Sequence, residues 1–318
     1  MQKAIDFLKN TKKDVGIFFD SDPDGTCSAA LMLAYFKQRK IRAKLFTGDL
    51  DKNSFIIFSR KKVSMAVFLD FALDSYPDFL KGFGNKRTLI IDHHPISNDL
   101  NKLGFVYVNP RFKNPNLYIS TSHFCFDILE KAGMKNFDWL YKIGDVGDHV
   151  IRGNIYEKEV VRTISAAKAV KGNEILPKIA EILSESKNIN EFLENKEFNG
   201  FKEIFFKEIK SQLDTIKKSR LQSVNFIEIK SKYSITSVIA SIVLDLYPDK
   251  TFIIFDKKKG FYHVSGRTYK FDIGKIFKKA SKGIGHGGGH ENAAGARIMV
   301  KDFKIFKQRI LSFIYNLR

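Results

Sequence analysis

The sequence predicts an α/β protein: a first domain built on a parallel sheet, then a long connecting helix, then a smaller α/β domain. Two observations lead to this prediction. Short apolar runs alternate with helical stretches in the first half of the chain, which is typical of a parallel sheet with helices on both faces. A charged, amphipathic stretch then separates that half from a second series of strands and helices. We therefore expect domains at residues 1–187 and 223–318, joined by a helix over 188–222.

The composition fits a two-domain protein that works in a reducing compartment. The chain has 318 residues, and its 44% hydrophobic content is enough for packed cores. Its two cysteines, Cys27 and Cys125, are too few for a disulfide framework or a cysteine-based zinc site. We find no run of 18 apolar residues and no apolar N-terminal signal. The sequence therefore predicts a cytoplasmic protein without a membrane span.

The net charge of +19 favours a polyanionic partner such as nucleic acid. The alternative is a Lys-rich composition that places lysine on every solvated surface, because composition alone does not locate a basic patch.

The elements of the first domain follow from its apolar periodicity. We expect strands at 15–19, 42–46, 63–69 and 88–91. We expect helices at 3–10, 26–38, 118–132 and 139–143.

Acidic residues stand at the ends of three of these strands: Asp20, Asp70 and Asp92. Parallel strands place their carboxyl ends on one edge of the sheet, where ligands usually bind. Asp22 and Asp24 follow Asp20 at alternate positions, in a turn that leads into a helix. Carboxylates this close repel one another unless a cation lies between them, and a hard divalent cation prefers such oxygens. Ordinary turn and helix-cap chemistry is the alternative for this Asp-Pro-Asp-Gly segment.

Two adjacent histidines, His93 and His94, add imidazole nitrogens to the same edge. A single histidine is usually an ordinary hydrogen-bonded residue. A pair directly after an aspartate at a strand end is better explained by a mixed oxygen and nitrogen site, which suits Mn²⁺ or a similar metal. We expect a loop at 144–149 to bring Asp148 to this region, together with His149, with a Gly-Asp turn as the alternative.

The order of these motifs resembles the DHH phosphoesterase superfamily. The motifs are Asp-x-Asp-x-Asp-Gly, a strand-terminal Asp, Asp-His-His and Gly-x-x-Gly-Asp, and they span residues 20–148. The superfamily includes RecJ-type single-strand exonucleases, nano-RNases with phosphoadenosine-phosphate phosphatase activity, cyclic-dinucleotide phosphodiesterases and family II pyrophosphatases. Phe18 stands where several relatives have a histidine, so the sequence is more similar to RecJ and its archaeal relatives.

The resemblance implies a site for two Mn²⁺ ions, with Mg²⁺ or Co²⁺ as alternatives. The implied ligands are Asp22, Asp24, Asp70, His93 and Asp148, with Asp20 as a further candidate. Asp70 would bridge the two ions. His94 would contact the substrate phosphate, and Asp92 would orient its neighbours.

The second half begins with an amphipathic helix, expected from about 189 to 221. Its basic residues could follow a nucleic-acid backbone, but a solvated helix face is the simpler explanation. Strands are then expected at 224–229, 251–255 and 260–268, and helices at 235–246 and 272–280.

A glycine-rich loop is expected at 283–295, where consecutive glycines expose backbone N–H groups that can hold a phosphate. This segment and the Ser-x-Arg segment that ends at Arg267 resemble the DHH-associated C-terminal domain. The resemblance implies that Arg267 and His290 bind substrate phosphate across a cleft between the domains, with Gly288 and Gly289 beside them. Arginine suits a phosphate because its guanidinium can donate two hydrogen bonds at once.

These expectations together predict a metal-dependent phosphodiesterase that hydrolyses single-stranded DNA or RNA by a two-metal mechanism, as RecJ does. The alternatives are a nano-RNA, phosphoadenosine-phosphate or cyclic-dinucleotide hydrolase, and a replication scaffold with little activity. The expected partners are a single strand or a short oligonucleotide, replication or repair proteins, and a second copy of the chain in a homodimer. We expect no oligonucleotide-binding fold of the kind that bacterial RecJ proteins have after residue 318, and we therefore expect a weaker grip on long strands.

Overall fold

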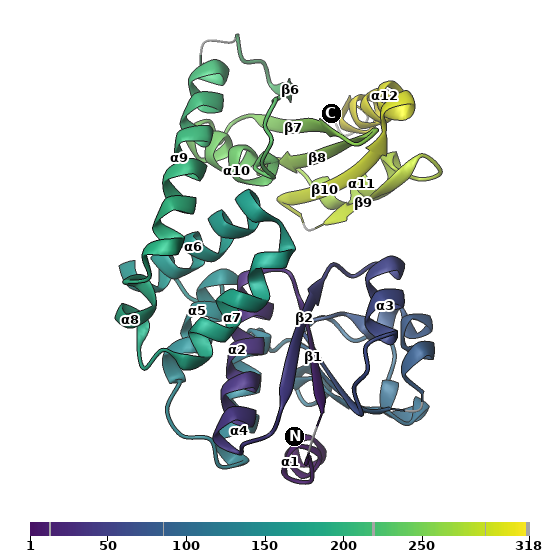
Figure 1. The fold of residues 1–318 in the computed structure, drawn as a ribbon. Helices are drawn as coiled ribbons and strands as arrows, with labels where there is room; N and C mark the ends of the chain where they lie inside the picture. Colours follow the sequence, from purple (N-terminus) through teal and green to yellow (C-terminus); the bar gives the residue numbers. More distant parts are fainter. Residues whose placement is uncertain (13, 85, 218–219, 290, 316–318) are drawn as a thin grey trace. The chain divides into compact units, whose positions relative to one another are not determined.

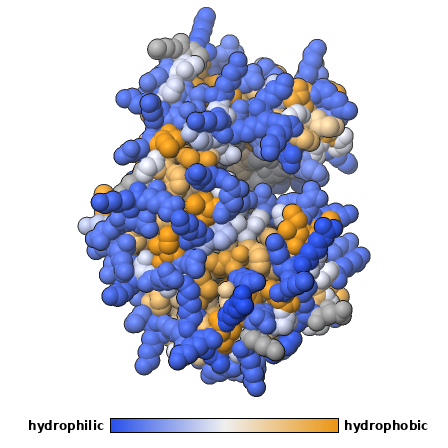
Figure 2. Space-filling model, viewed as in Figure 1, coloured by the Kyte–Doolittle hydropathy of each residue, from blue (hydrophilic) through white to orange (hydrophobic). Residues whose placement is uncertain are grey.

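The computed structural model of the chain describes residues 1–12, 14–84, 86–217, 220–289 and 291–315. It divides into two compact units, Met1–Lys202 and Glu203–Arg318, which run from purple to teal and from green to yellow in Figure 1. Figure 2 shows hydrophilic side chains over most of the visible face of each unit. None of the described helices is long and apolar enough to cross a bilayer.

The first unit is built on a five-stranded sheet in the order β2-β1-β3-β4-β5, and every neighbouring pair is parallel. The strands are β1 (Val15–Asp20), β2 (Ala43–Gly48), β3 (Met65–Leu69), β4 (Arg87–Ile91) and β5 (Val106–Val108). The predicted parallel sheet is confirmed. The sequence did not predict β5, because three residues are too few to show a period.

Helices cover both faces of this sheet. One face packs against α1 (Gln2–Lys9), α2 (Pro23–Gln38), α4 (Thr121–Lys131), α5 (Asp138–Gly147), α6 (Ile155–Lys171) and α7 (Leu176–Glu185). The other face packs against α3 (Lys52–Ser59) and short 3₁₀ turns, and Figure 1 shows α2 and α3 on opposite sides. The alternation of β1 explains the division, because Ile17 and Phe19 face the first layer and Phe18 the second. Helices α3, α6 and α7 were not predicted.

The chain between the two predicted domains forms two helices where the sequence predicts one. Helix α8 (Ile189–Leu193) ends before Asn195, and α9 (Lys196–Lys217) begins after it. The side chain of Asn195 accepts a hydrogen bond from the backbone N–H of Glu197 at 3.0 Å, which starts the new helix.

The second unit has a five-stranded sheet in the order β6-β7-β8-β10-β9. Its strands are β6 (Val224–Glu228), β7 (Thr251–Lys258), β8 (Phe261–Arg267), β9 (Gly285–Gly289) and β10 (Ala293–Met299). Helix α10 (Thr236–Leu246) covers one face, and α11 (Ile273–Ala280) and α12 (Phe303–Tyr315) cover the other. The smaller α/β domain is therefore confirmed.

The predicted glycine-rich loop is wrong in part, because Gly285–Gly289 is the edge strand β9, paired antiparallel with β10. Glycine permits this pairing: a Cβ on Gly285 would collide with the carbonyl oxygen of Arg297, and Gly289 has φ of 148°. His290 lies outside the described residues.

Candidate metal centre

The carboxyl edge of the first sheet collects the predicted acidic and histidine residues. Asp20 ends β1, Asp70 follows β3 and Asp92 follows β4, and β3 lies between β1 and β4. Three overlapping groups have ligand atoms within 4.8 Å of one another. They are Asp20 with Asp22 and Asp70, Asp24 with His93 and Asp148, and Asp70 with His93 and His94. Asp70 and His93 each belong to two of these groups.

The turn after β1 is held by ordinary helix capping. Asp22 is the N-cap of α2, and its side chain accepts a hydrogen bond from the backbone N–H of Gly25 at 2.7 Å. A Cβ on Gly25 would collide with the carbonyl oxygen of Asp20. The cap explanation is thus correct for Asp22, and it leaves the other carboxylate oxygen of Asp22 free to act as a ligand beside Asp20 and Asp70.

The start of α4 fixes two carboxylates at once, which the sequence did not predict. The backbone N–H groups of Thr121 and Ser122 donate to the two oxygens of the buried Asp24, at 2.7 and 2.9 Å. The hydroxyl of Thr121 donates to Oδ1 of Asp70 at 2.9 Å. The positive end of a helix therefore faces the acidic cluster.

Helix α5 supports the start of α4 through Asp145. Its Oδ1 accepts hydrogen bonds from the N–H of Ser120 at 3.3 Å and from its hydroxyl at 2.7 Å. Its Oδ2 lies 2.9 Å from Nδ1 of His123. Gly144 lets the helices approach, because a Cβ there would collide with the Ser122 hydroxyl and lie 2.5 Å from Oδ1 of Asp24.

The loop expected at 144–149 is therefore wrong: α5 continues through Gly147, and Asp148 is its C-cap. The reason is that Gly144 serves close helix packing, where the sequence pattern suggested a turn. Asp148 reaches the cluster, whereas the side chain of His149 is exposed and belongs to none of the described groups.

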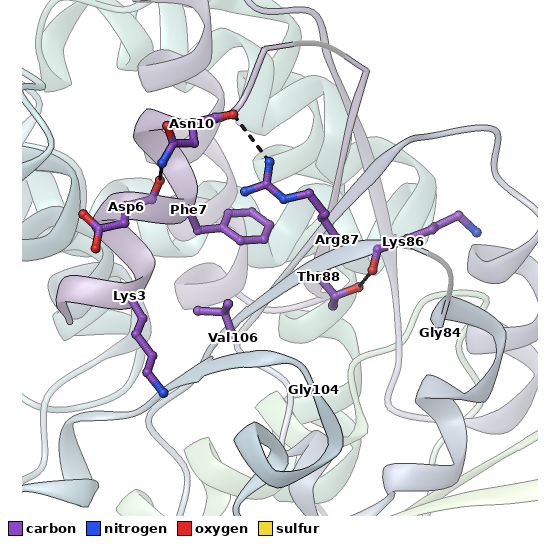
Figure 3. Close-up of a pocket in the computed structure, with 10 residues that line it drawn as sticks. All are labelled: Lys3, Asp6, Phe7, Asn10, Gly84, Lys86, Arg87, Thr88, Gly104 and Val106. Atoms are coloured by element: carbon purple, nitrogen blue, oxygen red, sulfur yellow. Dashed lines mark hydrogen bonds between the residues drawn. The ribbon is translucent and has the colours of Figure 1, made fainter.

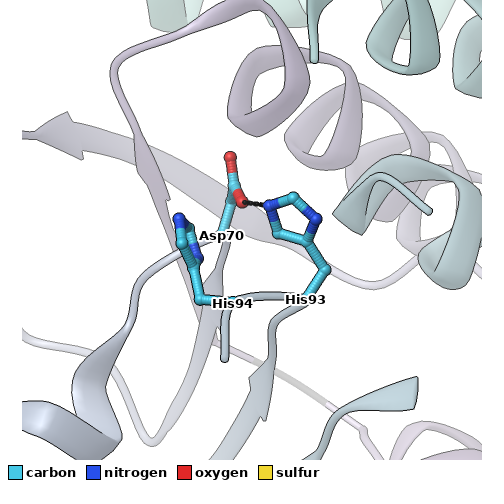
Figure 4. A group of neighbouring side chains, drawn as sticks. All are labelled: Asp70, His93 and His94. Atoms are coloured by element: carbon cyan, nitrogen blue, oxygen red, sulfur yellow. Dashed lines mark ion pairs between the residues drawn. The ribbon is translucent and has the colours of Figure 1, made fainter. Parts of the chain in front are cut away.

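His93 presents a lone pair to the carboxylates. Its Nδ1 lies 2.8 Å from the carbonyl oxygen of Ile119, and a carbonyl can only accept, so Nδ1 carries the proton. Its Nε2 lies 3.5 Å from Oδ1 of Asp70 and 3.3 Å from Oδ2 of Asp148. Burial lowers the pKa of His93, which favours the neutral ring. Figure 4 shows this ring directed toward Asp70.

His94 has the opposite electrostatic character. Its Nδ1 lies 2.7 Å from Oδ1 of the fully buried Asp92. Burial alone would lower the pKa of His94, but the hydrogen bond to Asp92 and the charges of Asp92 and Asp20 raise it to about 9. The His94 side chain is 40% exposed, so it offers a positive charge to an anion from solvent.

The carboxylates repel one another strongly in their buried positions. Burial and then the charge of Asp22 raise the pKa of Asp20 to about 8 and the pKa of Asp24 to about 7. Burial and then the charge of Asp24 raise the pKa of Asp148 to about 9 and the pKa of Asp70 well above its usual range. A set of acids with raised pKa values in one place indicates a position for positive charge.

The donor set fits a divalent metal. Oδ2 of Asp148 is buried and has no hydrogen-bond partner among the described residues. It lies beside the lone pair of His93 Nε2, and both are aimed at the same space as Asp24. Carboxylate oxygens with one imidazole nitrogen suit Mn²⁺ and similar ions.

Lys168, like the residues at the start of α4, lies near the acidic cluster and was not predicted from the sequence. Its ammonium donates to the carbonyl oxygen of Ser21 and, at 2.8 Å, to the Ser21 hydroxyl. Its charge lowers the pKa of Asp20, against the larger raising effects. Nothing in the sequence pattern of α6 links Lys168 to a turn 147 positions earlier.

The predicted substrate-binding residues of the second unit lie on its sheet. Arg267 ends β8, and its Nε donates to the Ser241 hydroxyl at 3.1 Å. The described residues offer its guanidinium no carboxylate within ion-pair distance, and burial lowers its pKa. Gly288 and Gly289 lie in the edge strand β9.

A cavity of about 610 Å³ lies at the opposite edge of the first sheet (Figure 3). It is lined by Arg87 and Val106, the first residues of β4 and β5, and by Phe7 and Asn10 from the N-terminal segment. None of the predicted site residues lines this cavity.

Family comparisons agree with the motif order. The DHH family, N-terminal domain, matches residues 14–147, and the DHHA1 domain matches residues 224–316. A search of curated proteins returns no match.

Solved structures share the fold at low sequence identity. RecJ from Thermus thermophilus in complex with Mn²⁺ has a TM-score of 0.78 and 13% identity, over 99% of this chain and 54% of that one. This chain thus spans about half of that protein. An exonuclease RecJ bound to manganese has a TM-score of 0.73 and 14% identity, over 98% and 93% of the two chains. A pGpG-specific phosphodiesterase from Vibrio cholerae has a TM-score of 0.55 and 14% identity, over 96% and 99%. At these identities the likeness establishes the fold alone.

Proposed function

This chain belongs to the DHH superfamily of phosphoesterases and carries a C-terminal DHHA1 domain, and from that premise we propose that it hydrolyses single-stranded nucleic acid as a RecJ-like exonuclease. The observation that carries the proposal is the acidic cluster at the carboxyl edge of the first sheet, with the lone pair of His93 aimed into it. Such a cluster is suited to two divalent ions, and we propose Mn²⁺.

The proposed ligands are six of the seven members of the three groups, and the seventh, His94, is proposed for the phosphate. The six are Asp20, Asp22, Asp24, Asp70, His93 and Asp148. Asp70 is the proposed bridge, and its membership of one group with Asp22 and another with His93 supports that role. When bound, two ions would lower the pKa of a water molecule and neutralise the charge that develops on the phosphate. The chain supplies the orientation: α4 holds Asp24 and Asp70 in place before any substrate arrives.

His94 is the proposed phosphate contact of the first unit. Its raised pKa keeps the ring charged near neutral pH, and Asp92 holds Nδ1, so Nε2 is free to donate to a phosphate oxygen. Arg267, Gly288, Gly289 and His290 are the proposed phosphate contacts of the DHHA1 domain. The absence of a carboxylate partner for Arg267 among the described residues supports this role.

The position of Tyr118 favours a substrate that carries nucleic-acid bases and disfavours inorganic pyrophosphate as the substrate. Its side chain is 51% exposed, and its ring centroid lies 6.0 Å from that of His93. Its hydroxyl donates to the backbone carbonyl of Asp148 at 2.8 Å, which fixes the ring beside the cluster. An exposed aromatic ring at such a place can stack on a base of any sequence.

The experiment is hydrolysis of 5′-labelled single-stranded DNA and RNA, from dinucleotides to long strands, with Mn²⁺ and with chelator. We expect stepwise, metal-dependent shortening of long strands, lost in Asp70→Asn and kept in Asp6→Asn, an exposed carboxylate at the opposite edge. Turnover of the shortest species alone would replace the proposal with a nano-RNA or dinucleotide hydrolase. No hydrolysis of any substrate by metal-loaded protein would replace it with a scaffold role.

A further inference from the structure

A second cavity, of about 420 Å³, lies beside the metal centre within the first unit. We call it the basic pocket, and it is lined by Val146, His149, Val150, Ile151, Arg152, Lys158, Val161 and Arg162. Val146 and His149 flank Asp148 in the sequence, so the pocket and the proposed metal ligand share one turn. The volume is larger than a phosphate needs and is in the range of ligand pockets.

The cations of the basic pocket are exposed to solvent and have almost no acidic partner among the described residues. Three of its lining residues are cations, and none is acidic. The side chains of Arg152 and Lys158 have no hydrogen bond or ion pair with any described residue, although the backbone N–H of Lys158 donates to the carbonyl oxygen of Asn154 within the helix. Among the described residues, the one ion-pair contact of Arg162 is with Glu159 at 3.7 Å, and Glu159 already accepts from Lys202 at 2.7 Å.

The placement of Lys158 and Arg162 is unfavourable without an anion. They are four residues apart in α6, so they project from the same helix face, where like charges repel. An anion between them would turn that repulsion into two attractive contacts. Apart from His149, the remaining lining residues, Val146, Val150, Ile151 and Val161, give the pocket an apolar floor.

The pocket is attached rigidly to the metal centre. The N–H groups of Val150 and Ile151 donate to the carbonyl oxygen of Asp145, at 2.8 and 3.3 Å. The side chain of Asp145 holds Ser120 at the start of α4, which in turn holds Asp24. One residue therefore fixes both the floor of the pocket and the helix that orients the proposed ligands.

From these observations we propose that the basic pocket binds one nucleotide of a single strand adjacent to the scissile bond, with its phosphate on Arg152, Lys158 and Arg162. The sugar and base lie on the apolar floor. This inference rests on the proposed function and adds to it a preference for substrates with more than one phosphodiester. A dinucleotide, whose one phosphodiester occupies the metal centre, gains nothing from the pocket.

The test compares two triple variants that remove the same charge. Arg152→Gln, Lys158→Gln and Arg162→Gln empty the pocket of cations. Lys9→Gln, Lys40→Gln and Lys135→Gln remove three exposed cations elsewhere on the first unit. Binding of fluorescent oligothymidylates in chelator and the KM for a dinucleotide and a dodecanucleotide with Mn²⁺ are measured for both. Thermal unfolding checks that each variant is folded.

We expect the pocket variant to bind the dodecanucleotide about tenfold more weakly than the control variant. The slope of the logarithm of its binding constant against the logarithm of the salt concentration should be shallower by about 2. Its KM should rise for the dodecanucleotide and change less than about twofold for the dinucleotide. The single variant Arg152→Gln should show a smaller change in the same direction.

Equal binding and equal KM in the two triple variants would overturn the proposal. Equal loss on the dinucleotide and the dodecanucleotide would also overturn it, because it would mean that the variant disturbs Asp148. If the wild type hydrolyses no substrate, the proposed function is wrong, and the binding comparison in chelator still decides whether the pocket holds a strand.

Discussion

The two edges of the first sheet differ in whether their charged side chains are exposed or buried. At the amino edge, Arg87 lies over the ring of Phe7 at 4.9 Å and beside a cavity open to solvent. At the carboxyl edge, Asp24 and Asp70 are buried among other carboxylates. The cavity at the amino edge is larger than the basic pocket at the carboxyl edge, yet its charged residues Asp6, Lys86 and Arg87 each have a hydrogen bond and none of them is buried. Buried charge without compensation, more than cavity volume, therefore indicates the edge where we propose the functional site.

Substitution of one carboxylate at each edge should give the largest difference in hydrolysis rate between the two edges. Asp70→Asn keeps the size and tolerates the left-handed backbone of that position, where φ is 65°. We expect hydrolysis to fall by at least about a thousandfold, because the variant loses a charged ligand shared by two groups. Asp6→Asn should change the rate by less than about twofold. Similar losses in both variants, measured as initial rates with Mn²⁺, would show that the carboxyl edge is not the site.

Removal of the hydroxyl that holds Asp70 should have an intermediate effect. Thr121→Val keeps the shape of the side chain but loses the 2.9 Å hydrogen bond. We expect Mn²⁺ affinity, measured by titration calorimetry, to fall about 10- to 100-fold with the fold intact. Thr163→Val, which loses a hydroxyl bond to the backbone of its own helix, is the matched control. Unchanged metal affinity in the Thr121 variant would show that the hydrogen bond from α4 to Asp70 does not contribute to metal binding.

The pH dependence of stability should report the electrostatic repulsion at the carboxyl edge without any substitution. The pKa values of Asp20, Asp24 and Asp148 are raised to about 8, 7 and 9 in the folded state. The folded protein then binds more protons than the unfolded chain, so its free energy of unfolding falls as pH rises toward those values. In chelator, we expect Tm to fall on the order of 5 °C from about pH 5 to about pH 8.

Saturating Mn²⁺ should abolish that fall, because the ions compensate the ionised carboxylates. A Tm that rises over the same range in chelator would mean that the cluster is already compensated within the chain. Scanning calorimetry at matched ionic strength makes the comparison.

Glycine substitutions should give the smallest effects, with opposite signs. Gly144→Ala places a Cβ against Ser122 and 2.5 Å from Oδ1 of Asp24, so we expect a loss of about 1–3 kcal/mol in the free energy of unfolding. Gly200→Ala meets nothing within 4 Å in α9 and should add up to about 1 kcal/mol. Urea titrations measure both. Equal effects would mean that the packing of α5 on α4 is loose.

The strand-end acids could be predicted from sequence because each follows an apolar run directly, so one rule about parallel sheets places them together. The role of α4 could not, since Asp24 and Thr121 are 97 positions apart and the donor is a backbone N–H, which every residue type but proline has. His93 and His94 are identical in type and differ only in partner, a carbonyl or a carboxylate.

The same limit applies to β9. Glycine has a low strand propensity, and Gly285–Gly289 forms a strand because β10 supplies the hydrogen bonds. The pairing with β10 determines the conformation of this segment, whereas its local sequence indicated a loop.

We propose that the carboxyl edge of the first sheet holds two divalent ions. The most direct measurement is the number of Mn²⁺ ions bound per chain, counted by equilibrium dialysis with electron paramagnetic resonance. We expect two ions in the wild type and a loss of at least one in Asp70→Asn. A wild-type chain that binds no Mn²⁺, or an Asp70→Asn chain that binds as many ions as the wild type, would contradict it.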